Sequence, residues 1–263
     1  MIFGALLHQS ESYLGFIKRQ LALGMDPFVM IPPRPPDVSN DHFDLYGLPV
    51  SYHPDVRIEE SVTQMPGEEW PIMVKTYYTP AGDLTAQVRQ TADWMWGDHV
   101  PFLDDYLIPR SKKFIVEGPD DLEAFQYLLV PPSDAEIEAF QRESKPVIDF
   151  ARQQDLLLTS GWGVGMDMIG WVHGLNKLIY DIYDHPDFVR DLFSMIAVWN
   201  RQRMAVVLDA GIDLFIKRAW YENTDFFTPA VWKQFIQPEL MRDAALAHEA
   251  GTKFGYIITD RAM

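Results

Sequence analysis

The 263-residue sequence contains no cysteine, which excludes disulfide bonds and thiolate metal sites within this chain. It is also poor in basic residues, with 22 Lys and Arg against 38 Asp and Glu and a formal net charge of -16. Because nucleic acids and anionic membranes attract basic surfaces, we expect neither as a partner. The acidity is mainly expected to keep the protein soluble.

Long apolar runs are missing as well. None approaches the roughly 20 residues that a membrane-spanning helix needs. The first 24 residues lack the basic leader and the small-residue cleavage site of a signal peptide. The expected location is therefore the cytoplasm.

The residues that are present suit a packed core, since 48% are hydrophobic and 13% are aromatic. We divide the chain into a first part, residues 1–112, and a second part, residues 113–263. The first part is expected to hold a helix over 3–23, a short strand at 28–31, an irregular cap over 34–70 and a β-hairpin over 71–90, with its turn at 80–83.

The second part alternates helices with strands that are almost continuously apolar. Helices are expected over 118–129, 133–154, 185–211 and 229–250, and strands near 155–160, 213–216 and 253–259. This alternation predicts an α/β fold with a parallel sheet covered by helices. Active sites of such folds lie at the carboxyl ends of the strands. The segment 161–167, "GWGVGMD", and the loop 217–228 are both expected there.

The loop after the strand at 213–216 carries the candidate catalytic residues Arg218, Tyr221, Glu222 and Asp225. An arginine can bind a carboxylate or phosphate there, while a carboxylate moves protons. The alternative is a surface loop that is stabilised by its own salt bridges.

The candidate substrate-binding residues are Trp162, Asp167, Trp220, Tyr256 and Arg89. The glycines around Trp162 could cradle an anion on backbone N–H groups, or they could form a close-packed turn without a ligand. They do not match G-x-G-x-x-G, so a dinucleotide site is not supported. Asp167 could instead cap a helix.

Aromatic and histidine side chains give weaker signals. Trp94, Trp96 and Trp162 could form the flat wall of a macrocycle pocket, or they could belong to the core. The seven histidines are scattered, without the i, i+4 spacing of a helical metal site, so no metal is expected.

Residues 113–260 resemble the uroporphyrinogen decarboxylase-like superfamily. The resemblance rests on "HPDFVRDLF", on "AGID" before a strand, and on Thr228-Pro229, Phe235, Pro238 and Gly251 in and after the next helix. "EGPDDLEAFQYLLVPP" matches an early segment of the superfamily in the same way. The resemblance implies a (β/α)8 TIM-barrel fold.

The resemblance also implies one of two chemistries, tetrapyrrole decarboxylation or corrinoid-linked methyl transfer. Ile257 and Thr259 stand where the zinc-binding His-x-Cys pair of many methyltransferases would fall, so zinc is not expected. Only Arg89 and Gln90 match the arginine-containing early stretch of the decarboxylases. We therefore expect corrinoid-dependent methyl transfer from a small methylated substrate. The alternatives are a uroporphyrinogen decarboxylase and a non-catalytic corrinoid-binding or partner subunit.

This expectation implies a corrinoid as co-substrate, no covalently bound cofactor, and a corrinoid protein as a partner. About five strands, including those near residues 28 and 72, can be counted against the eight of a closed barrel. We therefore expect a barrel that is incomplete at its C-terminus, with an open sheet edge, exposed apolar faces and a tendency to form homo-oligomers.

Overall fold

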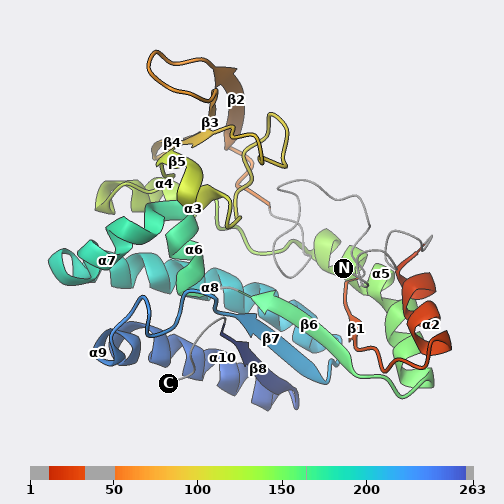
Figure 1. Cartoon of the computed structure of the whole chain (residues 1–263). Helices are drawn as coiled ribbons and strands as arrows, with labels where there is room; N and C mark the ends of the chain where they lie inside the picture. Colours follow the sequence, from red (N-terminus) through yellow and green to blue (C-terminus); the bar gives the residue numbers. More distant parts are fainter. Residues whose placement is uncertain (1–11, 33–50, 164, 259–263) are drawn as a thin grey trace.

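The computed structural model describes residues 12–32, 51–163 and 165–258. They form a mixed α/β fold with two separate four-stranded sheets, one parallel and one antiparallel. The antiparallel sheet lies at the top of Figure 1, and the parallel sheet lies in its lower half. Helices lie between the two sheets and against the parallel sheet.

The parallel sheet has the strand order β1-β6-β7-β8. Its strands are β1 (Val29–Met30), β6 (Leu158–Gly163), β7 (Leu214–Arg218) and β8 (Lys253–Ile257). The three strands expected in the second part of the chain are therefore present, and they pair in parallel as predicted. Strand β7 runs beyond its apolar residues, so Lys217 and Arg218 belong to the strand and not to the following loop.

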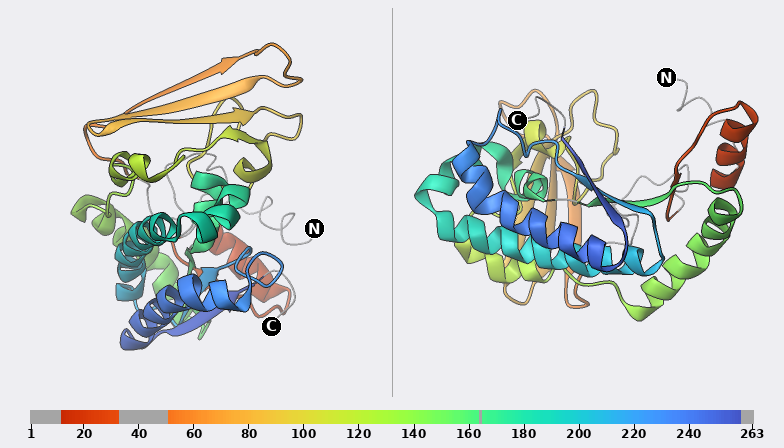
Figure 2. Two further views of the ribbon diagram at one scale, coloured as in Figure 1. Left: turned by 90° about the vertical axis from the view of Figure 1, so that its left-hand side faces the viewer. Right: turned by 90° about the horizontal axis from the view of Figure 1, so that it is seen from below.

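Two long helices run beside each other along this sheet, as Figure 2 shows. They are α8 (Pro186–Asp209) and α10 (Gln237–Glu249), and helices were expected at both places from the sequence. Phe215 of β7 packs in one core cluster with Val207 of α8 and Ala247 of α10. Gly211 and Gly251 follow the two helices with positive φ angles of 74° and 75°, a conformation that favours glycine.

Helices α2 (Tyr13–Ala22) and α5 (Asp134–Gln153) lie at the β1 end of the sheet (Figure 1). Ser133 caps α5: its hydroxyl accepts from the Glu136 N–H, and the Glu136 side chain accepts from the Ser133 N–H. This capping box explains why the helix begins at the predicted place.

The antiparallel sheet consists of β2 (Arg57–Thr63), β3 (Ile72–Thr79), β4 (Gly82–Arg89) and β5 (Ser111–Lys113). The predicted hairpin is confirmed as β3 and β4, joined at Thr79 and Gly82. Strand β2 corrects the expectation of irregular structure over 34–70. Its residues are all exposed at the sheet edge, so the sequence shows no alternation of buried and exposed positions there.

Shorter helices connect these elements. They are α3 (Leu107–Arg110), η1 (Pro119–Asp121), α4 (Leu122–Gln126), α6 (Met166–Ile169), η2 (Gly170–Gly174), α7 (Leu175–Asp184), α9 (Pro229–Val231) and η3 (Trp232–Ile236). The expected helix over 118–129 is thus a 3-10 turn with a short helix. The expected helix over 229–250 contains a π-helical turn, η3. Its predicted start is confirmed, since Thr228 caps it and Pro229 is its first residue.

The described strands do not close into an eight-stranded barrel. The strand near residue 72 was counted toward the barrel, but it pairs antiparallel in the other sheet. Strand β8 carries the half-buried Tyr256, and Asp260 lies outside the described residues. Met241 of α10 is exposed. Within the described ranges, no helix combines the length and apolar character needed to span a membrane.

Candidate active site at the carboxyl ends of the parallel strands

Three buried charged side chains meet at the carboxyl ends of β6 and β7. Arg218 is the last residue of β7, Asp167 lies in α6 directly after β6, and Glu222 lies in the loop after β7. Their exposed fractions are 3%, 0% and 0%. Charged groups are rarely buried so completely unless they are paired, and such groups mark candidate functional sites.

Each of the two carboxylates accepts hydrogen bonds from the segment that carries the other. Asp167 accepts hydrogen bonds from the backbone N–H groups of Trp220, at 2.9 Å, and of Tyr221, at 3.0 Å. Glu222 in return accepts one from the backbone N–H of Met166, at 2.6 Å. Helix α6 and the loop after β7 are therefore joined by three hydrogen bonds, two from the loop to Asp167 and one from α6 to Glu222.

The glycines of "GWGVGMD" provide space for close packing. A Cβ atom on Gly165 would lie 2.1 Å from Glu222 Oε1 and 3.1 Å from Lys217 Cε. A Cβ atom on Gly161 would lie 2.1 Å from the carbonyl oxygen of Ile216. These positions need glycine because a carboxylate and a neighbouring strand occupy the space of a side chain.

The Arg218 guanidinium makes cation–π contacts with two indole rings. Its Cζ atom is 4.7 Å from the Trp171 ring centroid and 3.7 Å from that of Trp220. Its Nη2 atom donates to Asp105, whereas Nε lies 3.7 Å from Asp167 Oδ2 and has no hydrogen-bond partner among the described residues. Trp171 is buried and Trp220 is half-buried, so Trp220 covers the more accessible side of the cation.

Asp105 and Trp171 were not predicted as site residues. Asp105 lies in the connection between β4 and α3, 113 positions before Arg218, and its Oδ1 accepts from Trp171 Nε1 at 2.9 Å. Trp171 lies in the π-helical turn η2, and turns of this kind are frequent at functional sites. No local pattern in the sequence connects Asp105 or Trp171 to Arg218.

The environment of Asp167 changes its protonation. Burial raises the pKa of the Asp167 carboxyl, and the neighbouring Glu222 raises it further. The two backbone N–H groups and Arg218 act in the opposite direction, and the resulting pKa is about 7. A carboxyl of this pKa can donate or accept a proton near neutral pH.

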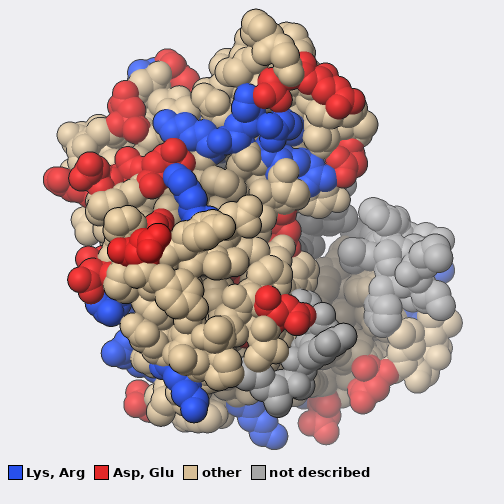
Figure 3. Space-filling view, turned by 60° about the vertical axis from the view of Figure 1, so that its left-hand side comes forward, with Lys and Arg blue, Asp and Glu red and all other residues tan. Residues whose placement is uncertain are grey.

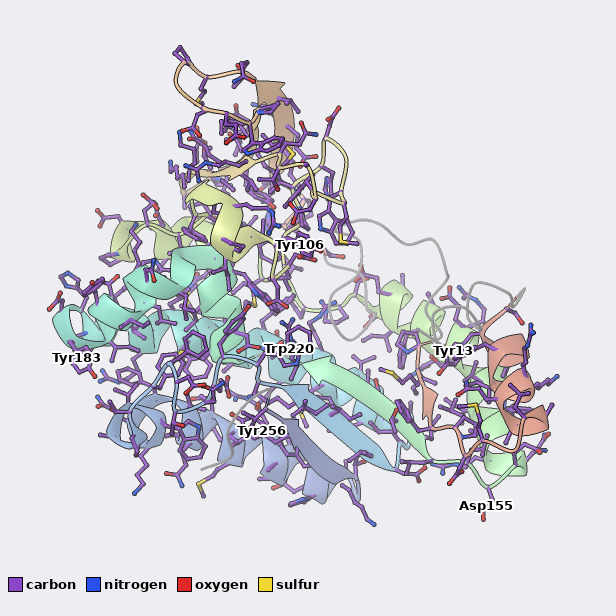
Figure 4. All side chains as sticks on the ribbon, in the orientation of Figure 1. Tyr13, Tyr106, Asp155, Tyr183, Trp220 and Tyr256 are labelled. Carbon is purple, nitrogen blue, oxygen red and sulfur yellow. The ribbon has the colours of Figure 1, made fainter. Side chains whose placement is uncertain are left out.

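Two tyrosines at the site stay protonated. Burial and the nearby Asp105 raise the pKa of Tyr221 to about 12. Burial and Glu222 also raise the pKa of Tyr256, whose hydroxyl donates to Glu222 Oε2. Both hydroxyls are therefore hydrogen-bond donors at neutral pH. Figure 4 shows Trp220 at the end of the parallel sheet, with Tyr256 below it on β8.

Lys217 supplies a second buried cation. Its Nζ atom donates to Asp243 of α10 at 2.5 Å. Burial alone would lower the pKa of Lys217, but Asp243 and Glu222 outweigh burial and raise it. Arg201 of α8 continues this network, with contacts of 2.7 Å to Glu239 and 3.3 Å to Asp243.

The structure brings together six of the nine predicted site residues: Asp167, Arg218, Trp220, Tyr221, Glu222 and Tyr256. Asp225 is exposed, and its backbone N–H donates to Asn223. The strand position of Trp162 is clear, but its side chain lies outside the described part of the structure. Among the described residues, no group of three or more His, Asp or Glu side chains is arranged to hold a metal ion.

Arg89 is not part of the group around Arg218. It lies on β4 of the antiparallel sheet and pairs with Glu68 at 3.1 Å. Lys112 pairs with the same Glu68, and Arg110 pairs with Asp93. Figure 3 shows Lys and Arg side chains gathered in the upper part of the molecule, beside acidic ones. Arg89 thus belongs to a surface network of paired charges.

Comparisons with known proteins give little further information. No protein-family model and no curated protein matches the sequence. A methyltransferase from Methanosarcina mazei resembles part of the structure, with 12% sequence identity and a TM-score of 0.39. The match covers 45% of this chain and 35% of that chain. A likeness this partial does not bear on function.

Proposed function

We propose that this protein is an enzyme that removes a methyl group from a small methylated substrate, with Asp167 as the proton donor. The observation that carries the proposal is the buried Asp167 carboxyl, whose pKa is about 7, with Arg218 Nε 3.7 Å away. A proton donor and a fixed cation at the carboxyl ends of parallel strands suit catalysis on a small molecule.

Such a pair can assist the removal of a methyl group. When a methyl group leaves an oxygen or nitrogen atom, that atom keeps the bonding electrons and becomes a better leaving group if it is protonated. Asp167 would supply this proton and take one back from water afterwards. Arg218 would stabilise negative charge that develops before the proton arrives. A substrate would approach the pair past the half-buried Trp220 ring.

The methyl acceptor in this proposal is a reduced corrinoid, which acts as a co-substrate and is delivered by a partner protein. The half-buried rings of Trp220 and Tyr221 suit contact with a flat ring system, because aromatic side chains pack well against such surfaces. The donor is a methylated oxygen or nitrogen compound.

The test uses the full chain with reduced cobalamin and a panel of methanol, methoxyaromatic and methylamine donors. Transfer is followed as the loss of reduced cobalamin absorbance and the formation of methylcobalamin. We expect Asp167→Asn to lower the rate by about 10²- to 10⁴-fold. Asp149→Asn, which removes an exposed carboxylate paired with Lys145 on α5, should leave the rate unchanged.

Other outcomes would favour the alternatives. Release of carbon dioxide from uroporphyrinogen, without methyl transfer, would identify a decarboxylase. Co-elution of cobalamin with the protein and no turnover of any donor would indicate a non-catalytic binding subunit. Full activity of the Asp167→Asn variant would remove Asp167 from the mechanism.

A further inference from the structure

The Arg218 guanidinium group is surrounded by two indole rings and two carboxyl groups. The ring centroids of Trp171 and Trp220 lie 4.7 Å and 3.7 Å from Cζ. Nη2 donates to Asp105, and Nε lies near Asp167 Oδ2. The cation therefore lies between two carboxylates, bonded to one and separated from the other by 3.7 Å.

Asp105 is held in place by the same tryptophan that covers Arg218. Trp171 Nε1 donates to Asp105 Oδ1 at 2.9 Å, while the other carboxylate oxygen of Asp105 accepts from Arg218. Asp105 and Trp171 thus contact each other and the guanidinium. Both oxygens of Asp167, in contrast, are engaged by the backbone N–H groups of Trp220 and Tyr221.

From this geometry we propose that Asp105 is a positioning residue, which holds Arg218 back from Asp167 and so leaves Asp167 able to carry a proton. The inference rests on the proposed role of Asp167 as the proton donor. If Arg218 moved to a hydrogen bond of about 2.8 Å with Asp167, the charge-assisted contact would favour the ionised carboxylate.

Arg218 is the charged group near Asp167 that favours its ionised form. The charged or titratable groups that act on Asp167 are Arg218 on β7, Tyr221 and Glu222 in the following loop, and Tyr256 on β8. Glu222 favours the protonated form, and the two tyrosines are neutral. Lys217, the other buried cation of the site, pairs with Asp243 and interacts with Glu222. Arg218 is the cation that acts on Asp167, and together with the backbone N–H groups of Tyr221 and Trp220 it favours the carboxylate.

The test is a carboxyl ¹³C NMR titration of the full chain with ¹³C-labelled aspartate, in which the Asp167 signal is assigned with Asp167→Asn. In Asp105→Asn, the amide oxygen can still accept from Trp171 Nε1, but the amide NH2 group replaces the oxygen that accepts from Arg218. We expect the Asp167 titration midpoint to fall by about one pH unit or more, a tenfold loss of proton affinity. An unchanged or higher midpoint would overturn the proposal.

Two controls separate positioning from a simple change in charge. Asp104→Asn removes the adjacent negative charge, but Asp104 bonds to the Tyr106 backbone N–H and not to Arg218, so the midpoint should fall less. In an Arg218→Met background, Asp105→Asn should have no effect, because Asp105 acts through Arg218. An equal fall with Asp104→Asn, or in the Arg218→Met background, contradicts the positioning role.

Trp171→Phe provides a second variant if Asp105→Asn does not fold. It keeps a ring over Arg218 and removes the N–H group that holds Asp105, so we expect a smaller fall in the midpoint; no fall contradicts the proposal. The titration needs no substrate, so its outcome can be distinguished from a failure of the proposed methyl transfer. An absence of methyl transfer together with the expected shift would reject the function and keep the positioning role.

Discussion

Asp167 accepts two hydrogen bonds from the backbone of the loop that carries Glu222, and Glu222 accepts one from the backbone of the helix that carries Asp167. The contact places two carboxyl groups in one buried site, where ionisation of both is unfavourable. Glu222 therefore contributes to the raised pKa of Asp167, in addition to burial. The contact between α6 and the loop after β7 therefore also helps to keep Asp167 protonated near neutral pH.

The Gly165→Ala substitution tests how tightly this contact is packed. The new Cβ atom would lie 2.1 Å from Glu222 Oε1, so the carboxylate or the loop must move. We expect the free energy of unfolding, measured in denaturant, to fall by about 1–3 kcal/mol. Gly118→Ala is the matched control, because nothing lies within 4 Å of its new Cβ. Equal effects of the two substitutions would contradict the packing described for Gly165.

The parallel strands, the hairpin and the longer helices could be predicted because each depends on local sequence. Residues 214–216 are apolar, and the helix after them begins at the Thr228 cap that the sequence shows. The predicted group around Arg218 followed from strand direction alone, since carboxyl ends of parallel strands share one edge. Patterns of this kind need no knowledge of distant contacts.

The remaining features depend on contacts between distant parts of the chain. Asp105 lies in the connection between β4 and α3 and binds Arg218 at the end of the parallel sheet. The periodicity of the sequence gives no sign of that contact. The edge strand β2 has no buried face, so it lacks the alternation that marks strands. The strand near 72 was assigned to the wrong sheet because apolar alternation shows that a strand exists but not its partner.

The pKa of Asp167 predicts a pH dependence of stability. The native pKa of about 7 lies above the ordinary 3.8, so the folded state binds the proton more tightly between these values. The contribution of Asp167 to the free energy of unfolding is therefore fully present below about pH 4 and lost as the pH rises through 7. The change is at most about 4 kcal/mol.

The measurement is chemical unfolding of the wild type and of Asp167→Asn at several pH values. We expect the difference, wild type minus variant, to decrease as the pH rises from 4 to 7 and to level off above 7. The variant also loses an acceptor for one backbone N–H group, which shifts the difference by a constant amount. A difference that increases with pH would show that the native pKa of Asp167 is lowered.

The lowered pKa of Glu60 predicts the opposite pH dependence of stability. Burial alone would raise the pKa of Glu60, but His99, the buried Lys75 and the backbone N–H of Val100 outweigh burial and lower it to about 2. Its stabilising contribution is therefore present above the ordinary value of 4.5 and lost as the pH falls through 2.

Unfolding of Glu60→Gln tests this contact. We expect the free energy of unfolding of the wild type to exceed that of the variant by about 2 kcal/mol near neutral pH. The value is kept this small because Glu60 is partly exposed, so solvent screens its contacts. The difference should decrease as the pH falls from 4.5 to 2. The contact matters for the site because Glu60 binds His99 and Val100, which lie in the connection that leads to Asp105. A difference that does not depend on pH would exclude an ionised Glu60 as the source.

The pH dependence of methyl transfer tests the roles of Asp167 and Glu222 together. If protonated Asp167 is the donor, the rate should be constant below its pKa and should fall as the pH rises through about 7. Glu222→Gln removes the neighbouring negative charge, so the Asp167 pKa should be lower and the fall should begin at a lower pH.

Tyr256→Phe is the matched control. It removes the hydroxyl that donates to Glu222 but keeps the Glu222 charge beside Asp167. It should therefore destabilise the protein by about 1 kcal/mol and leave the alkaline limb of the profile at or above its wild-type position. An alkaline limb that stays in place in Glu222→Gln would contradict the assignment, because charge repulsion between Glu222 and Asp167 is part of what keeps the proton on Asp167.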